Sequence, residues 1–287
     1  MAAMRFILAF VLLLSASATA ATKPARGFFD ELAAKLEPTR VVVYKNVGER
    51  ELHLNIFEPL GFKPGDKRPC FLSIHGGGWT GFSPRRQYPA AAHFAKQGMV
   101  AISVEYRLAQ KGSDTTVFDC VKDARSAMRY VRAHAAELGI DPQKIAANGG
   151  SAGGHLAAGL ALFDGVDEAG EDTSVSCLPN ALVLFYPVID TSTEGYGNAK
   201  IGERWQEISP VHRVKAGVPP TIIFHGTGDT VTPFKGAQAF RNAMLKAGNR
   251  CELVVNEGGK HGHIIFDPVL WEDALRKTEA FLKETIK

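Results

Sequence analysis

The sequence predicts a single α/β domain with a mostly parallel, doubly wound sheet of about eight strands and helices on both faces. Two observations support this class. Several short segments are apolar along their whole length, as expected of strands buried on both faces. These segments alternate with helical stretches, and no linker, repeat or low-complexity segment interrupts them. The 287 residues are enough to bury a substantial core.

The first half of the chain begins with a hairpin and continues as alternating strands and helices. Residues 40–44 and 51–57, with a turn at Gly48, are expected to pair as antiparallel strands. Two short apolar strands are expected next, at 70–75 and 99–104. Apolar residues then recur at helical spacing over 118–138, and Gly139 is expected to end this helix.

The second half repeats the alternation. An apolar strand over 144–147 leads into a helix rich in alanine and leucine over 152–163, and Pro187 ends the next strand, 181–186. The remaining elements are strand 221–225, helix 234–247, strand 251–255 and helix 267–286. In such a sheet the carboxyl ends of the strands meet at one edge, where functional sites form.

Residues 1–20 have the features of a secretory signal peptide. Arg5 is the single charged side chain, residues 6–14 are apolar, and Ala18 and Ala20 fit a small-residue cleavage site. We therefore expect cleavage after Ala20 and a secreted or periplasmic mature chain, residues 21–287. A membrane anchor is the alternative, but an apolar run of about nine residues is short against the ~20 of a spanning helix. No membrane association is expected after cleavage.

Charge and cysteine content limit which binding partners, disulfides and cofactors are expected. Lys+Arg 33 against Asp+Glu 30 leaves a net charge of +3 without a basic block, so no nucleic-acid partner is expected. Export would allow disulfides among Cys70, Cys120, Cys177 and Cys251, and both pairing and four free thiols remain open. The cysteine spacing matches no metal motif, and no metal or organic cofactor is predicted. The oligomeric state is not predicted.

A glycine-flanked serine stands between a predicted strand and a predicted helix. The segment Gly149-Gly-Ser151-Ala-Gly153 has the G-x-S-x-G spacing, in which the glycines allow a sharp turn that exposes the serine oxygen. A glycine turn with a capping serine is the simpler alternative, and no G-K-[ST] follows as in a phosphate-binding loop. The strand–turn–helix context favours Ser151 as a nucleophile.

A second glycine-rich loop follows another strand. In His75-Gly-Gly-Gly-Trp79, glycines allow backbone N–H groups to approach a developing oxyanion closely. His75 is expected to hydrogen-bond the loop backbone and not to act as the base. Trp79 is expected either to pack internally or to form a wall of the acyl pocket, where it would contact substrate.

An acid and a histidine follow the last two strands. Asp229 lies in Gly226-Thr-Gly-Asp229, and His261 lies in the glycine loop after strand 251–255. Chain order Ser151, Asp229, His261 is that of the strand–turn–helix serine hydrolases, in which an acid orients the catalytic imidazole. His263 is an alternative base, and Asp190 is an alternative acid one strand earlier.

The sequence resembles the α/β-hydrolase superfamily, and within it the HGGG-type, hormone-sensitive-lipase-like esterases and lipases. It is similar there to bacterial secreted acetyl-esterase-like and feruloyl-esterase-like members over about residues 41–282. The motifs are His75-Gly-Gly-Gly-Trp79, Glu105-Tyr-Arg-Leu108, Gly149-Gly-Ser-Ala-Gly-Gly154, Ser209-Pro210, His225-Gly-Thr-Gly-Asp229 and His261-Gly262. The resemblance implies that Ser151, His261 and Asp229 are nucleophile, base and acid. It also implies an oxyanion hole formed by the N–H groups of Gly77, Gly78 and Ala152.

The sequence departs from these relatives in several places. Only short segments precede the first strand and follow Pro187, so a large helical cap is not expected. Gly150 replaces a frequent aspartate, and His263 replaces a frequent phenylalanine. Arg85 and Arg86 are expected to lie in a solvated loop, with contact to an acidic sugar as the alternative. An open cleft favours small or accessible esters over long-chain lipids.

These features predict a serine carboxylesterase that acts on short-chain or carbohydrate-linked esters, acetyl or feruloyl, as small molecules or on a polysaccharide. A prolyl-oligopeptidase-like peptidase and an amide or lactone hydrolase share the same machinery and are alternatives. A non-catalytic binding protein on a hydrolase scaffold would require a broken triad or oxyanion loop, and neither motif is broken in the sequence.

Overall fold

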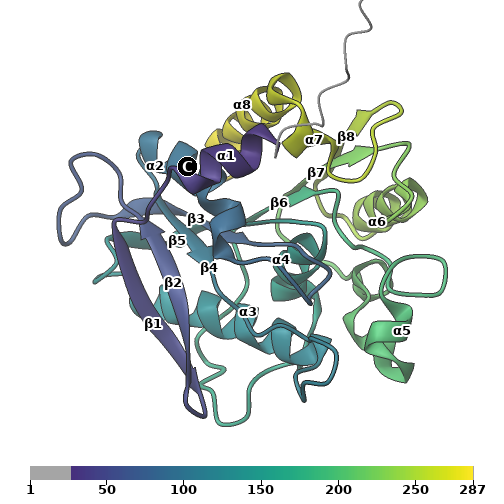
Figure 1. Cartoon of the computed structure of the whole chain (residues 1–287), viewed down its shortest axis with the longest axis horizontal. Helices are drawn as coiled ribbons and strands as arrows, with labels where there is room; N and C mark the ends of the chain where they lie inside the picture. The colour runs from purple at the N-terminus through teal and green to yellow at the C-terminus, as the bar shows by residue number, and fades with distance from the viewer. Residues whose placement is uncertain (1–26, 287) are drawn as a thin grey trace, which may run out of the picture.

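An eight-stranded sheet runs through the centre of the computed structural model, which describes residues 27–286 (Figure 1). The strands are β1 (Arg40–Val47), β2 (Arg50–Phe57), β3 (Arg68–Ile74), β4 (Val100–Val104), β5 (Ile140–Gly150), β6 (Ala181–Phe185), β7 (Thr221–Gly226) and β8 (Cys251–Asn256). Their order across the sheet is β1-β2-β4-β3-β5-β6-β7-β8. The predicted signal peptide, residues 1–20, lies outside the described residues.

The sheet is antiparallel at one edge and parallel elsewhere. β1 pairs antiparallel with β2, and β2 pairs antiparallel with β4. From β4 through β3, β5, β6 and β7 to β8, every neighbouring pair is parallel. The predicted α/β-hydrolase sheet with an antiparallel N-terminal hairpin is therefore confirmed.

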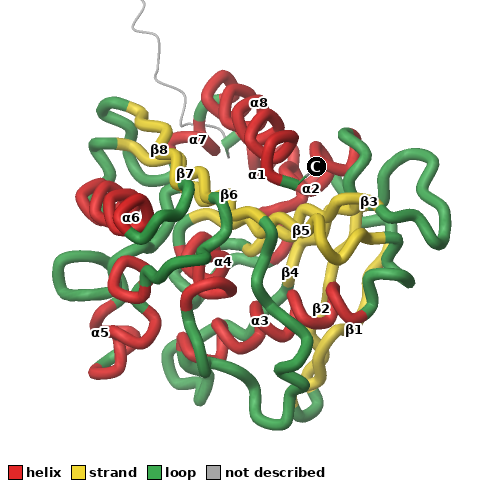
Figure 2. The backbone as a smooth tube through the Cα atoms, turned by 180° about the vertical axis from the view of Figure 1, so that it is seen from behind, coloured by secondary structure: helices red, strands yellow, loops and turns green. Residues whose placement is uncertain are grey.

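Helices cover both faces of the sheet, and two apolar cores result (Figure 2). One face packs against α3 (Val117–Ala133), α4 (Ala152–Leu162) and α6 (Phe234–Lys246). The other packs against α1 (Phe28–Ala34), α2 (Tyr88–Lys96) and α8 (Pro268–Thr285). Because successive side chains of a strand point to opposite faces, Leu72 joins the first core and Phe71 the second.

Two sequence predictions need correction. Helix α3 ends at Ala133, not at Leu138, because His134 leaves the helical conformation and the chain turns several times before Gly139. β5 is longer than residues 144–147, since Ile140 already pairs with Arg68.

Helices α1 and α2 were not predicted from the sequence. The remaining short helices are α5 (Asn198–Ile201), α7 (His263–Phe266), and the 3₁₀ turns η1 (Pro84–Gln87), η2 (Glu203–Ile208) and η3 (Pro210–Arg213). They lie in connecting segments, where the sequence has no apolar periodicity that would predict a helix.

The four cysteines are buried and free, so the open question of pairing is settled in favour of thiols. Burial raises the pKa of Cys120 and that of Cys251 to about 12, which leaves them protonated at neutral pH. Over residues 27–286, no helix combines the length and apolar character needed to cross a membrane.

Candidate active site

Ser151 occupies a strained turn between β5 and α4. Its φ of 54° and ψ of −122° are unusual for a residue with a side chain, as in a nucleophile elbow. The turn is tight because α4 packs directly on β3: a Cβ atom on Gly153 would lie 2.1 Å from the carbonyl oxygen of Ile74. The glycine at this position is therefore required by close backbone contact, and it brings Ser151 to the carboxyl edge of the sheet.

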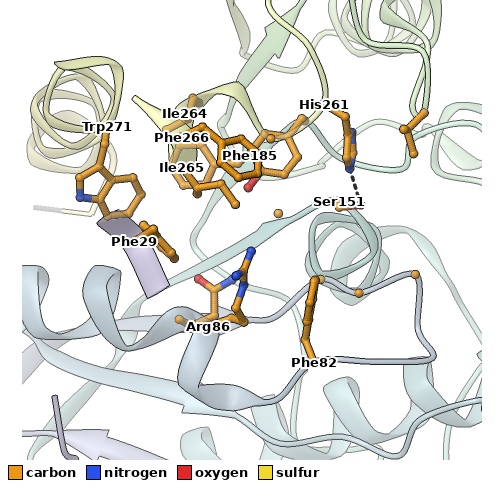
Figure 3. A pocket seen from close by; sticks show the side chains of 18 of the residues that line it. Phe29, Phe82, Arg86, Ser151, Phe185, His261, Ile264, Ile265, Phe266 and Trp271 are labelled. Atoms are coloured by element: carbon orange, nitrogen blue, oxygen red, sulfur yellow. Dashed lines mark hydrogen bonds between the residues drawn. The ribbon is translucent and has the colours of Figure 1, made fainter. Parts of the chain in front are cut away.

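The three side chains predicted as a triad form one hydrogen-bonded chain. His261 Nε2 lies 3.0 Å from Ser151 Oγ (Figure 3), and His261 Nδ1 lies 2.8 Å from Asp229 Oδ2. The Asp229 side chain is fully buried, whereas that of His261 is 23% exposed. This arrangement can transfer a proton from the serine to the imidazole while the carboxylate holds the imidazole in place.

The Asp229 carboxylate is held by several donors. Oδ1 accepts hydrogen bonds from the N–H groups of Val231 and Thr232, each at 2.9 Å, and Oδ2 also accepts from Thr232 Oγ1 at 2.9 Å. Burial raises the pKa of Asp229, but the hydrogen bonds from His261 and the backbone outweigh burial and hold it below its ordinary value. Asp229 is therefore ionised at neutral pH and can balance an imidazolium.

The Gly76–Gly78 loop faces Ser151 across the opening of a cavity. Gly77 has φ of 103°, and its carbonyl oxygen accepts from the N–H groups of Thr80 and Gly81, each at 3.1 Å, so the loop folds back on itself. Within residues 27–286, the N–H groups of Gly77, Gly78 and Ala152 donate to no protein acceptor. Of these three predicted oxyanion donors, Gly77 and Gly78 line the cavity, whereas Ala152 is buried behind Ser151.

His75 and Trp79 flank this loop and are both buried. His75 stacks on Tyr106 with ring centroids 4.3 Å apart, and its Nδ1 hydrogen-bonds the Gly76 carbonyl oxygen at 2.9 Å. Burial lowers the pKa of His75 to about 4, which keeps it neutral and structural.

The prediction that Trp79 contacts substrate is wrong. The side chain is fully buried and packs between His155, at a ring-centroid distance of 5.0 Å, and Tyr196, at 5.6 Å. Its φ of 63° accompanies this inward orientation. The internal packing that the sequence left as the alternative is the one observed, and Trp79 does not line the cavity.

A cavity of about 430 Å³ opens beside Ser151 and His261 (Figure 3). The end away from the serine is apolar and comprises Phe29, Phe185, Ile264, Ile265, Phe266 and Trp271. Arg86 points into the cavity near Phe82, with its guanidinium carbon 4.5 Å from the Phe82 ring centroid, and it forms an ion pair with Asp30. The pair is locally neutral, so the cavity suits an uncharged organic group. Arg86 was expected to lie in a solvated loop, but its side chain forms part of the cavity wall.

The BD-FAE family model matches residues 54–244. The chain belongs to the BD-FAE family of α/β-hydrolase esterases. Similar proteins bear the names carboxylic ester hydrolase and esterase.

Solved structures of an esterase from Thermogutta terrifontis resemble this BD-FAE member. Esterase 2 phosphoramylated by tabun is 45% identical, with a TM-score of 0.81 over 85% of this chain and 94% of that one. Est2 with bound propionate is 44% identical, with a TM-score of 0.80 over 85% and 93%.

Curated relatives are more distant and longer. The probable carboxylic ester hydrolase LipM of Mycobacterium tuberculosis is 30% identical over 67% of this chain and 48% of its own length. An acetylxylan esterase of Xylanibacter ruminicola is 29% identical over 67% and 40%. The chain spans about half the length of the curated relatives it matches, or less.

The structure decides between the alternatives left open by the motifs. His263 hydrogen-bonds the Lys260 carbonyl oxygen at 3.1 Å from the first position of α7, while His261 holds both Ser151 and Asp229. Asp190 accepts from the Ser192 N–H at 2.8 Å and hydrogen-bonds no histidine of the described chain. His261 and Asp229 are therefore the members of the hydrogen-bonded chain.

Several residues of the site were not found from the sequence. Tyr186 packs against His261 with ring centroids 5.0 Å apart, and Thr232 braces Asp229. Phe29, Phe266 and Trp271 come from the two ends of the chain and meet only in the folded molecule. No motif marks them, although the positive φ of Tyr186, 35°, indicates a constrained position in the structure. In residues 27–286, no cluster of His, Cys, Asp or Glu is arranged to hold a metal ion.

Proposed function

We propose that this protein is a secreted or periplasmic carboxylesterase in which Ser151, His261 and Asp229 form a catalytic triad. The observation that carries the proposal is the continuous chain of hydrogen bonds, 3.0 Å from His261 Nε2 to Ser151 and 2.8 Å from His261 Nδ1 to Asp229, at the opening of a cavity. Free N–H groups on the facing loop give it further support.

The reaction proceeds in two halves. His261 Nε2 takes the Ser151 proton as Oγ attacks the ester carbonyl carbon, and the N–H groups of Gly77, Gly78 and Ala152 stabilise the oxyanion. The imidazolium, balanced by Asp229, then protonates the leaving alcohol. A water molecule then gives a proton to the same nitrogen and attacks the acyl carbon. The bond from that carbon to Ser151 Oγ breaks, His261 returns the proton to Oγ, and the acid is released.

The proposed substrates are short-chain or carbohydrate-linked esters of the acetyl or feruloyl type. A solved relative holds propionate and another relative is an acetylxylan esterase, which supports small acyl groups and polysaccharide-linked esters. The segment between β6 and β7 contains only α5, η2 and η3, so the cavity has no large helical lid from this part of the chain. The aromatic far end of the cavity provides room for a larger acyl group.

Replacing Ser151 tests the proposal. Ser151→Ala removes the attacking oxygen and should lower kcat for p-nitrophenyl acetate by a factor on the order of 10⁶. A variant that retains more than about a tenth of wild-type activity would exclude Ser151 as the nucleophile. Circular dichroism and thermal unfolding of both proteins control for folding.

The substrate class needs a separate comparison. The substrates to compare are acetylated xylan, a feruloylated oligosaccharide and p-nitrophenyl esters of increasing chain length. We expect kcat/KM to decrease as the aliphatic acyl chain becomes longer than a short one. The aromatic feruloyl ester is the expected exception to this decrease. A steady rise of kcat/KM with aliphatic chain length would contradict the proposed preference.

A further inference from the structure

Tyr196 and Lys200 form a pair that contacts the oxyanion loop from the segment after β6. Lys200 Nζ donates to the Tyr196 hydroxyl oxygen at 2.9 Å and to the Gly78 carbonyl oxygen at 3.2 Å. The ammonium also lies 5.0 Å from the centroid of the Tyr196 ring. The pair therefore joins the α5 segment to the loop that carries the predicted oxyanion donors.

The chemistry of the two groups determines where the phenol proton points. An ammonium group has donors and no acceptor, so Tyr196 must accept from Lys200 through a lone pair. The hydroxyl proton is then left to donate elsewhere. Among residues 27–286, no protein acceptor receives a hydrogen bond from the Tyr196 hydroxyl. Tyr196 lines the same cavity as Ser151 and His261, so this donor is available to a molecule bound there.

The Tyr196 hydroxyl also lies close to the oxyanion loop. A Cβ atom on Gly78 would come within 2.6 Å of the hydroxyl oxygen and 3.0 Å of Lys200 Nζ. The ring is held by the buried Trp79 ring, and the Tyr196 N–H donates to the Asp190 carbonyl oxygen at 2.9 Å. A donor fixed in this way loses little freedom when it binds a developing charge.

We propose that the Tyr196 hydroxyl is a further catalytic donor that hydrogen-bonds the substrate carbonyl oxygen as it becomes an oxyanion. It acts beside the N–H groups of Gly77 and Gly78, and Lys200 is the positioning residue that orients it. The proposal rests on the proposed esterase function. The proton stays on the tyrosine throughout, and the hydrogen bond strengthens as negative charge develops on the substrate oxygen.

Tyr196→Phe removes the hydroxyl and keeps the ring that packs on Trp79. We expect kcat for p-nitrophenyl acetate to fall about 10- to 100-fold, with KM nearly unchanged, because the lost hydrogen bond forms mainly in the transition state. Tyr130→Phe is the matched control, since Tyr130 lies on α3 stacked against His134 with ring centroids 4.1 Å apart. It should leave kcat/KM unchanged.

A transition-state analogue separates this role from a structural one. A trifluoromethyl ketone adds to the serine and places an oxyanion in the hole, so its inhibition constant should rise in Tyr196→Phe by about the factor by which kcat/KM falls. Unchanged kcat/KM and unchanged inhibition in a variant that unfolds at the wild-type temperature would overturn the proposal.

The role of Lys200 is tested by a double-mutant cycle. Lys200→Met keeps an unbranched side chain and removes the donors, and we expect a smaller loss in kcat, about 3- to 10-fold, because the hydroxyl can rotate away. In the Tyr196→Phe background the same substitution should have almost no effect. An equal loss in both backgrounds would overturn the positioning role of Lys200.

Failure of this proposal is distinguishable from failure of the proposed function. If wild-type protein hydrolyses the ester and Ser151→Ala does not, the esterase function stands whatever Tyr196→Phe shows. If Ser151→Ala keeps its activity, the triad itself is wrong, and the Tyr196 proposal fails with it.

Discussion

The His261 imidazole owes its orientation to one carboxylate. Asp229 accepts from Nδ1, and the Thr232 hydroxyl lies 2.9 Å from the same carboxylate oxygen. Asp229→Asn replaces the acceptor with an amide and favours the wrong imidazole tautomer, so kcat should fall by about 10⁴. Steady-state kinetics at neutral pH would measure the loss.

Asp190→Asn is the control for that substitution, because Asp190 is the alternative acid that the sequence offered and its side chain accepts from the Ser192 N–H. Its activity should stay close to that of the wild type. A loss as large as that of Asp229→Asn would reverse the assignment.

Since the pKa of Asp229 is held below its ordinary value, the carboxylate stays ionised as acid is added. Protonation of Asp229 should therefore contribute nothing to any change of kcat/KM between pH 7 and pH 5.

Among the secondary-structure elements, the contact between α4 and β3 positions Ser151. A Cβ on Gly153 would lie 2.1 Å from the Ile74 carbonyl oxygen, a distance that real contacts do not reach. Gly153→Ala should force the two elements apart and lower the free energy of unfolding by roughly 3 kcal/mol or more, together with activity. Urea unfolding monitored by fluorescence would measure the change.

Gly236 in α6 is the matched control, and its substitution should change the free energy of unfolding in the opposite direction. A Cβ there meets only the Asp190 Cβ at 3.5 Å, an ordinary contact, and the backbone is helical. Gly236→Ala should therefore raise the free energy of unfolding by about 0.5–1 kcal/mol, because alanine restricts the unfolded chain. Equal changes in the free energy of unfolding for the two substitutions would contradict the role of close packing at Gly153.

At the scale of the whole molecule, buried neutral histidines make stability depend on pH. Burial lowers the pKa of His75 and that of His155 to about 4. The unfolded chain binds a proton at each below about pH 6.5, whereas the folded chain does so only near pH 4. Stability should therefore fall as pH drops from about 6.5 towards 4, by roughly 2 kcal/mol per histidine between pH 7 and pH 5.

His155→Gln tests this dependence. His155 Nε2 donates to the Ile208 carbonyl oxygen at 2.7 Å, and a glutamine amide can make the same hydrogen bond without titrating. The variant should lose less stability than the wild type between pH 7 and pH 5 in urea unfolding. A pH dependence as steep as that of the wild type would contradict the contribution of His155.

Much of the architecture could be predicted from local sequence. Wholly apolar strands, helical spacing and glycine or proline at element ends determine the alternation of strands and helices and the parallel sheet. The boundaries of α3 and β5 were less predictable, because Leu138 continues the apolar spacing after the backbone has left the helix. Helices α1 and α2 depend on packing against other elements.

From the sequence alone, Ser151, Asp229 and His261 could be placed in glycine-rich loops at strand ends, because each of these loops is a short motif that is contiguous in the chain. The surroundings of these three residues follow from the folded molecule. Folding buried Trp79 inside the protein, turned Arg86 into the cavity and placed Tyr196 against Gly78. The reason is physical, since these contacts join segments far apart in the chain, and local propensity does not encode which distant side chain fills a given space.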